Sequence, residues 1–159
     1  MYELPEIRSI VDRAAIVDTI VACANAIDAK DWQKLRSYLA EEIDIDYSDF
    51  RGELPRRVTA EQYITQRVEA LAGLRTLHIS TNHEVTINNN NNTAKCKSIY
   101  QIYRLDPDRA AAENRLDTAG NYFHSLMQTN GNWVITGIKQ TVTIVNGNYQ
   151  IHGALRGKS

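Results

Sequence analysis

The chain has 159 residues, of which 43% are apolar and 23% are charged, and its net charge is −1. This length suits one domain with its own buried core, and we expect a single domain over residues 1–159. A net charge near zero argues against nucleic acid and against an anionic membrane as partners. The two cysteines, Cys23 and Cys96, lie far apart in the sequence. Their spacing indicates neither a zinc site nor a disulfide framework.

The N-terminal segment MYELPEIRS has no basic stretch followed by an apolar run, as a secretion signal would have. No segment approaches the roughly 20 apolar residues of a membrane span. Both observations predict a cytoplasmic protein.

Residues 6–30 are predicted to form one or two helices. Two apolar rows recur there at helical spacing, Ile16-Ile20-Cys23-Ile27 and Val17-Val21-Ala24. Asp28 continues the second row, four residues after Ala24. Burying a carboxylate costs several kcal/mol unless it is hydrogen-bonded. Asp28 is therefore a candidate site residue, although a helix end that faces water explains it equally well.

Asp31 is a suitable N-cap for a second helix over residues 31–42. An alternating segment, residues 43–50, then predicts a short strand. In this strand Tyr47 shares a face with Ile43 and Ile45, so we expect the ring to point inward with a hydroxyl that needs a partner.

Residues 51–57 are predicted to be a loop. Thr59 and Gln62 then form a capping box, which predicts a third helix that Gly73 terminates.

The pattern changes to strands from residue 74 onward. Strands are expected over residues 76–87, 93–105, 121–128 and 132–147, with an Asn-rich turn at 88–92 and a charged connection at 106–120. The tail, residues 148–159, is expected to be loose or to reach a neighbouring subunit. Helices followed by an antiparallel meander predict an α+β fold, in which helices on a long curved sheet can enclose a pocket.

The strand over residues 76–87 carries two of the four histidines. Simple alternation places His78 on one face with Ser80, and His83 on the opposite face with Ile79 and Val85. An imidazole among small polar groups is a candidate general acid or base. We therefore take His78 as a candidate catalytic residue and His83 as structural.

Other polar side chains on the later strands are candidates to line the pocket. One of Tyr100 and Tyr103 should point inward, and Tyr122 shares a face with His124. We take Tyr103, Tyr122 and His124 as candidate substrate-binding residues, although tyrosines in strands more often serve packing.

The run AIDAKDWQKLRSYLAEEIDIDYSDFRG, a following helix and the segment LRTLHISTNHEV together resemble the SnoaL-like branch of the NTF2-like superfamily. More narrowly, they resemble scytalone dehydratase. The resemblance extends over roughly residues 10–145. It implies a cystatin-like cone of three helices against a strongly bent sheet, with the active site inside the cone and no cofactor. It also implies a homo-oligomer, either a dimer or a trimer.

The resemblance assigns roles to three residues. Asp28 matches a carboxylate that holds an active-site imidazole, Tyr47 a tyrosine that orients a water against the substrate carbonyl, and His78 a catalytic histidine. The family's second tyrosine falls on Ile27, and its second histidine falls within residues 102–104, so neither is kept. These changes argue against scytalone itself as the substrate.

The residues themselves favour the same chemistry. An imidazole held by a carboxylate can remove a proton next to a carbonyl and return it to a leaving hydroxide, while Tyr47 donates to the enolate. We therefore expect a cofactor-independent lyase, dehydratase-like, acting on a small, fairly apolar carbonyl or polyketide-like ligand. Two alternatives stay open: an isomerase or polyketide cyclase, and a non-catalytic module for ligand binding or assembly.

Overall fold

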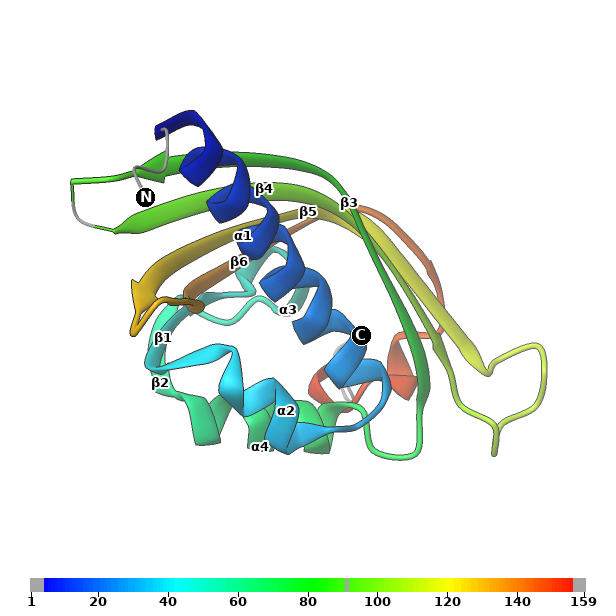
Figure 1. Cartoon of the computed structure of the whole chain (residues 1–159). Coiled ribbons are helices and arrows are strands. Elements are labelled where there is room, and N and C mark those ends of the chain that lie inside the picture. The colour runs from blue at the N-terminus through cyan, green and yellow to red at the C-terminus, as the bar shows by residue number, and fades with distance from the viewer. Residues whose placement is uncertain (1–4, 91, 156–159) are drawn as a thin grey trace.

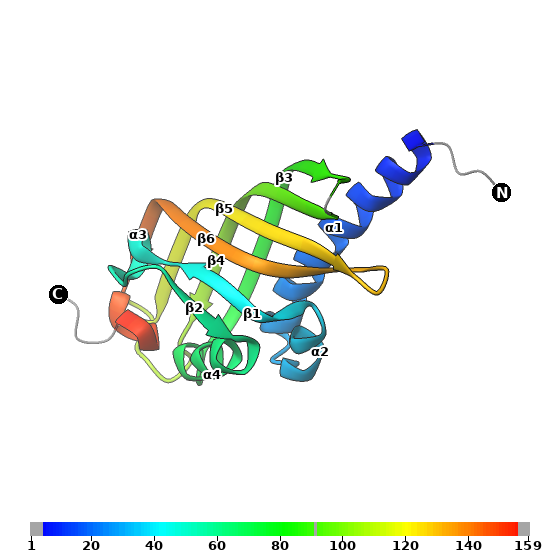
Figure 2. The ribbon, with the colours of Figure 1, turned by 90° about the vertical axis from the view of Figure 1, so that its left-hand side faces the viewer.

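The computed structural model describes residues 5–90 and 92–155. Three helices lie on the concave side of one curved sheet (Figures 1 and 2). The longest, α1 (Pro5–Asp28), crosses the sheet, while α2 (Trp32–Ser37) and α4 (Ala60–Ala70) lie together below it. The helices and the sheet thus form a cone with an interior.

The sheet has six strands, in the order β2 (Arg56–Thr59), β1 (Leu39–Asp46), β6 (Asn132–Gly147), β5 (Arg115–Thr129), β4 (Thr93–Leu105) and β3 (Arg75–Asn88). β1 and β6 pair in parallel, and the other neighbours pair antiparallel. This is the expected α+β arrangement of helices on a strongly curved, mostly antiparallel sheet.

Register shifts mark the places where the sheet bends. Two lie between β5 and β6, one lies between β1 and β6, at Leu39–Asp44, and one lies between β3 and β4, at Thr81–Glu84. Such bulges bend a strand and increase its twist. At one of them a Cβ on Gly120 would lie 2.0 Å from the carbonyl oxygen of Thr141. This bend therefore requires glycine.

The predicted second helix is too long and the following strand begins too late. The helix ends at Ser37, and β1 begins at Leu39, because pairing with β6 buries Leu39 and Ile43. Residues Ser48–Arg51 form a short helix, α3, instead of the end of that strand. The predicted loop over residues 51–57 also contains the beginning of β2.

The helices α1 and α4 agree with the predicted boundaries, whereas β5 begins earlier than predicted. Residues 6–30 contain one helix rather than two, and the capping box of Thr59 and Gln62 begins α4 as expected. β5 begins at Arg115 rather than at residue 121, because its first residues pair with the ends of β4 and β6.

The tail is ordered as far as the structure describes it. It contains two short 3-10 helices, η1 (Tyr149–Ile151) and η2 (Gly153–Leu155). Ile151 and Leu155 in these helices, and His152 between them, are buried. The ring of His152 lies edge-on against Phe50, with a centroid distance of 5.7 Å. The expectation of a loose tail is therefore wrong for residues 148–155, and residues 156–159 lie outside the described part.

The core lies between α1 and the concave face of the sheet. The predicted row Ile16-Ile20-Cys23-Ile27 is buried there, as the sequence indicates. No helix within residues 5–90 and 92–155 is both long and apolar enough to cross a membrane.

Candidate active site

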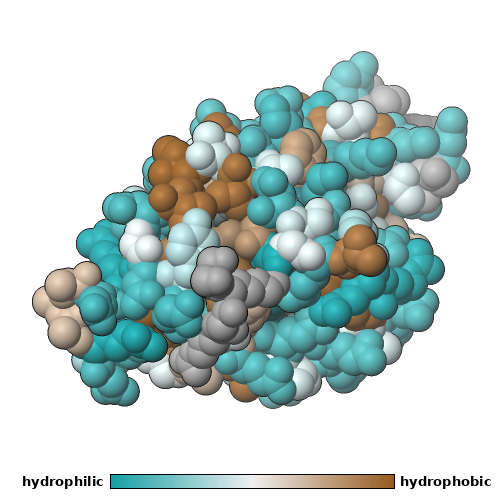
Figure 3. Space-filling view, turned by 180° about the vertical axis from the view of Figure 1, so that it is seen from behind, coloured by the Kyte–Doolittle hydropathy of each residue, from teal (hydrophilic) through white to brown (hydrophobic). Residues whose placement is uncertain are grey.

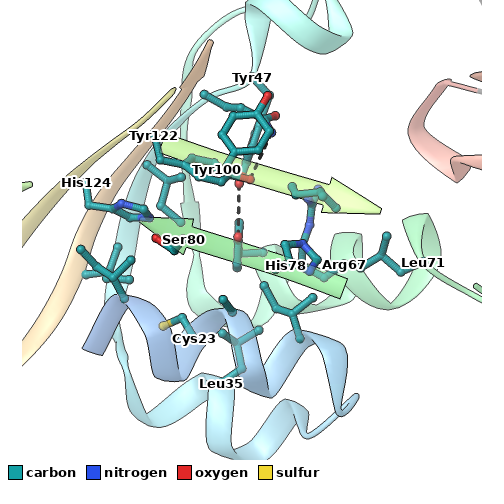
Figure 4. Close-up of a pocket in the computed structure, with 18 of the residues that line it drawn as sticks. Cys23, Leu35, Tyr47, Arg67, Leu71, His78, Ser80, Tyr100, Tyr122 and His124 are labelled. Atoms are coloured by element: carbon teal, nitrogen blue, oxygen red, sulfur yellow. Dashed lines mark hydrogen bonds between the residues drawn. The ribbon is translucent and has the colours of Figure 1, made fainter. Parts of the chain in front are cut away.

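A cavity of about 60 Å³ lies inside the cone, between α1, α4 and the sheet (Figure 4). This volume holds a few water molecules or the reacting part of a small ligand. Apolar side chains such as Ile20, Cys23 and Leu35 line one side. The polar side chains that line it are Tyr47, Arg51, Tyr63, Arg67, His78, Ser80, Tyr100, Arg104, Tyr122, His124, Gln140 and His152.

Asp28 and His78 meet at the edge of this cavity, where the last residue of α1 lies against β3. Nδ1 of His78 lies 2.6 Å from Oδ1 of Asp28. The backbone N–H of His78 donates to Oδ2 at 2.7 Å, and the hydroxyl of Thr76 donates to Oδ1 at 2.8 Å. The pair predicted from the sequence is thus brought together, and Nε2 of His78 remains available to a ligand.

The surroundings of this pair favour a neutral imidazole beside an ionised carboxylate. Burial lowers the pKa of His78. The hydrogen bond and negative charge of Asp28 raise it in part, and the positive charges of Arg104 and Lys30 lower it further. Burial alone would raise the pKa of Asp28, but the hydrogen bonds and charge of His78, with the Thr76 hydroxyl, lower it overall. Near neutral pH the imidazole is therefore in the state that a general base requires.

Tyr47 points into the cavity from the end of β1, as predicted. Its hydroxyl lies 3.2 Å from the hydroxyl of Tyr63, and both rings are buried. Burial raises the pKa of Tyr63, so this hydroxyl keeps its proton. Sequence reasoning missed Tyr63, which lies on α4 one helical turn before Arg67.

Tyr122 and His124 both line the cavity from β5, with ring centroids 5.3 Å apart. Nε2 of Gln140 donates to the Tyr122 hydroxyl at 3.1 Å. Burial raises the pKa of Tyr122, so its own proton stays available for donation to a ligand. Burial lowers the pKa of His124 to about 4, which keeps this ring neutral.

Tyr103 does not line the cavity, and Tyr100 does. On β4, Tyr100, Ile102 and Arg104 point inward, whereas Tyr103 is half-buried on the outer face, 5.5 Å from the guanidinium carbon of Arg115. The choice of Tyr103 is thus corrected to Tyr100. Both faces of β4 carry apolar and polar residues, so alternation alone could not decide which tyrosine points inward.

His83 lies on the same side of β3 as His78, contrary to expectation. The register shift between Thr81 and Glu84, with Asn82 at a φ of 53°, inserts a bulge that reverses the alternation. Nε2 of His83 lies 2.9 Å from Oγ of Ser80, which lines the cavity. Burial lowers the pKa of His83 as well.

Three arginines also line the cavity and were not predicted. Arg51, Arg67 and Arg104 are only 4%, 7% and 4% exposed. Nη1 of Arg104 donates to Oγ1 of Thr118 at 3.0 Å. Burial lowers the pKa of Arg104 to about 10, so it remains charged at neutral pH. A signal was present in the sequence, because Arg104 follows Tyr100 and Ile102 at the spacing of one strand face.

Among the described residues, no group of three or more His, Cys, Asp or Glu side chains is placed to bind a metal ion. Cys23 and Cys96 are buried thiols in different elements. Burial raises the pKa of Cys96 to about 11 and that of Cys23 further. Neither thiol is therefore a thiolate near neutral pH.

The profile of the SnoaL-like domain family matches residues 8–139. This chain belongs to the SnoaL-like family. The match extends from α1 into β6 and includes Asp28, Tyr47 and His78, so the resemblance seen in the sequence is confirmed. No curated protein matches the chain.

Solved structures share the fold of this SnoaL-like protein. The Kfla4162 protein from Kribbella flavida is 22% identical, with a TM-score of 0.82, over 87% of this chain and 95% of its own. A provisionally assigned scytalone dehydratase from Novosphingobium aromaticivorans is 14% identical, with a TM-score of 0.77, over 95% and 97%. A hexachlorocyclohexane dehydrochlorinase, LinA type 2, is 14% identical, with a TM-score of 0.75, over 92% and 95%. At these identities the likeness shows an NTF2-like fold.

Proposed function

We propose that this SnoaL-like protein is a cofactor-independent lyase of the dehydratase type. His78 is its general acid and base, and the substrate is a small, fairly apolar carbonyl or polyketide-like compound. The observation that carries the proposal is the 2.6 Å contact between His78 and Asp28 at the wall of the cavity. A carboxylate in this position fixes the imidazole and stabilises its protonated form.

The proposed reaction has two proton transfers. Nε2 of His78 first removes a proton from the carbon next to the carbonyl, and the electron pair moves to the carbonyl oxygen as an enolate. The enolate then re-forms the carbonyl, a C=C bond forms, and the C–O bond to the β-hydroxyl breaks. His78 returns its proton to the departing hydroxide, so that the products are one water and the unsaturated carbonyl compound.

The enolate oxygen requires hydrogen-bond donors in a site from which bulk water is excluded. Tyr122 is suited to this role, because it accepts from Gln140 and keeps its own proton. The Tyr47–Tyr63 pair supplies a second phenolic donor, because one of the two hydroxyl protons is not used between them. His124 and Tyr100 complete the polar wall around the ligand.

The comparisons support an elimination over the alternatives. Two proteins with this fold are named for eliminations, a dehydratase and a dehydrochlorinase. An isomerase or polyketide cyclase would use the same base without loss of water. A non-catalytic ligand-binding or assembly module would have no use for a histidine that contacts one carboxylate through both its ring and its backbone N–H.

A panel of small β-hydroxy ketones tests the proposal, with product mass as the measurement. We expect loss of one water, and a decrease in turnover of at least ~10²-fold in His78→Ala. His83→Gln is the control, because this residue lies on the same strand outside the proposed chemistry. A product of unchanged mass would indicate an isomerase or cyclase. Near-normal turnover in His78→Ala would exclude His78 as the base.

We also propose that the protein forms a homo-oligomer, a dimer or a trimer, as the SnoaL-like resemblance suggests. The convex face of the sheet exposes apolar side chains, among them Leu77, Ile99 and Phe123. Figure 3 shows apolar groups gathered in patches on a mostly hydrophilic surface. Light scattering on purified protein measures the number of subunits directly.

A further inference from the structure

Two of the cavity arginines, Arg67 and Arg104, are buried without a carboxylate partner. No ion pair joins either guanidinium to an Asp or Glu in the described part of the chain. Within residues 5–90 and 92–155, Nε and Nη2 of Arg67 and Nε of Arg104 also lack a hydrogen-bond acceptor. Burying a charge in this way is strongly unfavourable unless something compensates it.

The surrounding groups compensate these charges incompletely. The guanidinium carbon of Arg67 lies 5.2 Å from the ring centroid of Tyr47 and 5.3 Å from that of Tyr63. Arg104 lies in the same way 5.6 Å from Phe50. Aromatic faces attract cations, but they carry no net negative charge.

The nearby formal charges do not provide a counter-ion either. Asp117 attracts Arg104, but its carboxylate is paired with Arg115 at 3.0 Å. Asp28 is bound to His78. Burial lowers the pKa of Arg51 and of Arg104, and the positive charge of Arg67 lowers each further. No described Asp or Glu lines the cavity, so this wall is positive and has no negative partner within it.

We propose that Arg67 and Arg104 bind a carboxylate group of the small substrate. Guanidinium groups are planar forks whose donors match the two oxygens of a carboxylate. Both arginines lie on the wall of a cavity whose remaining lining is mainly apolar, so a single anionic group on an apolar body fits it. That this ligand is the substrate rests on the dehydratase-type function proposed above.

The strand register connects this anion site to the catalytic histidine. Thr76 pairs with Arg104, and the next inward pair is His78 with Ile102. Arg104 and His78 are therefore diagonal neighbours on the inner face of the sheet. A carboxylate held by Arg104 would place an adjacent carbon beside Nε2 of His78. The substrate class is accordingly a small hydroxy acid with a carbonyl group and an apolar body.

Calorimetric titration with matched acids and amides tests the anion site. The probes are benzoate, cinnamate and 3-phenylpropanoate, each compared with its primary amide. We expect at least one acid to bind wild-type protein ten-fold or more tightly than its amide, and Arg104→Met or Arg67→Met to abolish this preference. Arg75→Met, an exposed arginine on β3, should retain it. Equal binding of every acid and its amide would overturn the proposal, as would full acid binding in both cavity variants.

Thermal melting gives a second readout that does not depend on activity. Arg67→Met and Arg104→Met remove uncompensated buried charges, so each should melt at or above the wild-type temperature without ligand. The tightest-binding acid should raise the melting temperature of wild type and Arg75→Met but not of the two cavity variants. An equal ligand-induced rise in all four proteins would contradict an arginine-built site.

The variant His78→Gln separates this inference from the proposed function. It should lose turnover and still prefer the acid over the amide, because the carboxylate is bound by the arginines. Acid preference together with normal turnover in His78→Gln would refute the catalytic proposal alone. Loss of turnover in this variant, with no acid preference in wild type, would refute the anion site alone.

Discussion

The two charged parts of the cavity wall differ in how their charges are balanced. Around His78, the carboxylate of Asp28 accepts three hydrogen bonds, and the imidazole is held in one orientation. Around Arg67 and Arg104, two buried positive charges have no carboxylate partner among the described residues. The first region is complete without a ligand, whereas the second would be completed by an anion. In the functions proposed above, the first part transfers the proton and the second part selects the ligand.

Asp28→Asn, a change in the region around Asp28 and His78, gives the largest expected decrease in turnover. An amide cannot stabilise the imidazolium of His78 and can select the wrong tautomer, so turnover should fall by about 10²- to 10⁴-fold. Acid binding at Arg67 and Arg104 should persist. The measurement is turnover on the β-hydroxy ketone panel, with Asp18→Asn, an exposed carboxylate on the same helix, as control. Equal turnover in the two variants would show that the carboxylate beside His78 has no catalytic part.

A second prediction concerns stability and His124, which lies on the same wall. Its pKa is about 4 in the folded protein and about 6.5 when unfolded. Below pH 6.5 the unfolded chain binds a proton that the folded protein does not, so stability falls as the pH drops from 6.5 to 4. The loss amounts to about 3 kcal/mol.

Urea unfolding at pH 7 and pH 4 checks this value. His124→Asn does not titrate, so its free energy of unfolding should lose about 3 kcal/mol less than that of wild type over this range. Identical pH dependence in the two proteins would show that burial does not keep His124 neutral.

The pH dependence of catalysis gives a smaller, graded effect. Burial lowers the pKa of His78, so the neutral base should persist below pH 6.5. At pH values below that lowered pKa, kcat/KM should fall about ten-fold per pH unit as the base is protonated. Arg104→Met removes one of the positive charges that lower this pKa, so its profile should shift to higher pH. An unchanged profile in this variant would show that the two regions are electrostatically independent.

Local sequence patterns pointed to Asp28, Tyr47 and His78 because each of these residues follows the simple periodicity of its helix or strand. Asp28 continues an apolar row of α1, Tyr47 alternates with buried isoleucines, and His78 lies on a regular part of β3. The family resemblance then related these three positions to one another. The structure places all three on or beside a single cavity.

The remaining site residues depend on contacts that are distant in sequence. The bulge at Asn82 moves His83 to the face of β3 that carries His78. A prediction that assumes regular alternation along the strand cannot detect such a bulge. Whether Tyr100 or Tyr103 points inward is decided by the pairing of β4 with its neighbours. Arg67 and Arg104 were missed because an arginine is ordinarily expected at the surface.

Deuterium incorporation tests the central claim, that His78 moves a proton at carbon, most directly. The protein is incubated in D2O with whichever β-hydroxy ketone of the panel it turns over or binds. NMR then follows the replacement of hydrogen by deuterium at the carbon next to the carbonyl. We predict exchange with wild type and with His83→Gln, and a decrease of at least ~10²-fold with His78→Ala. Exchange at the wild-type rate in His78→Ala, or no exchange in wild type, would contradict the account.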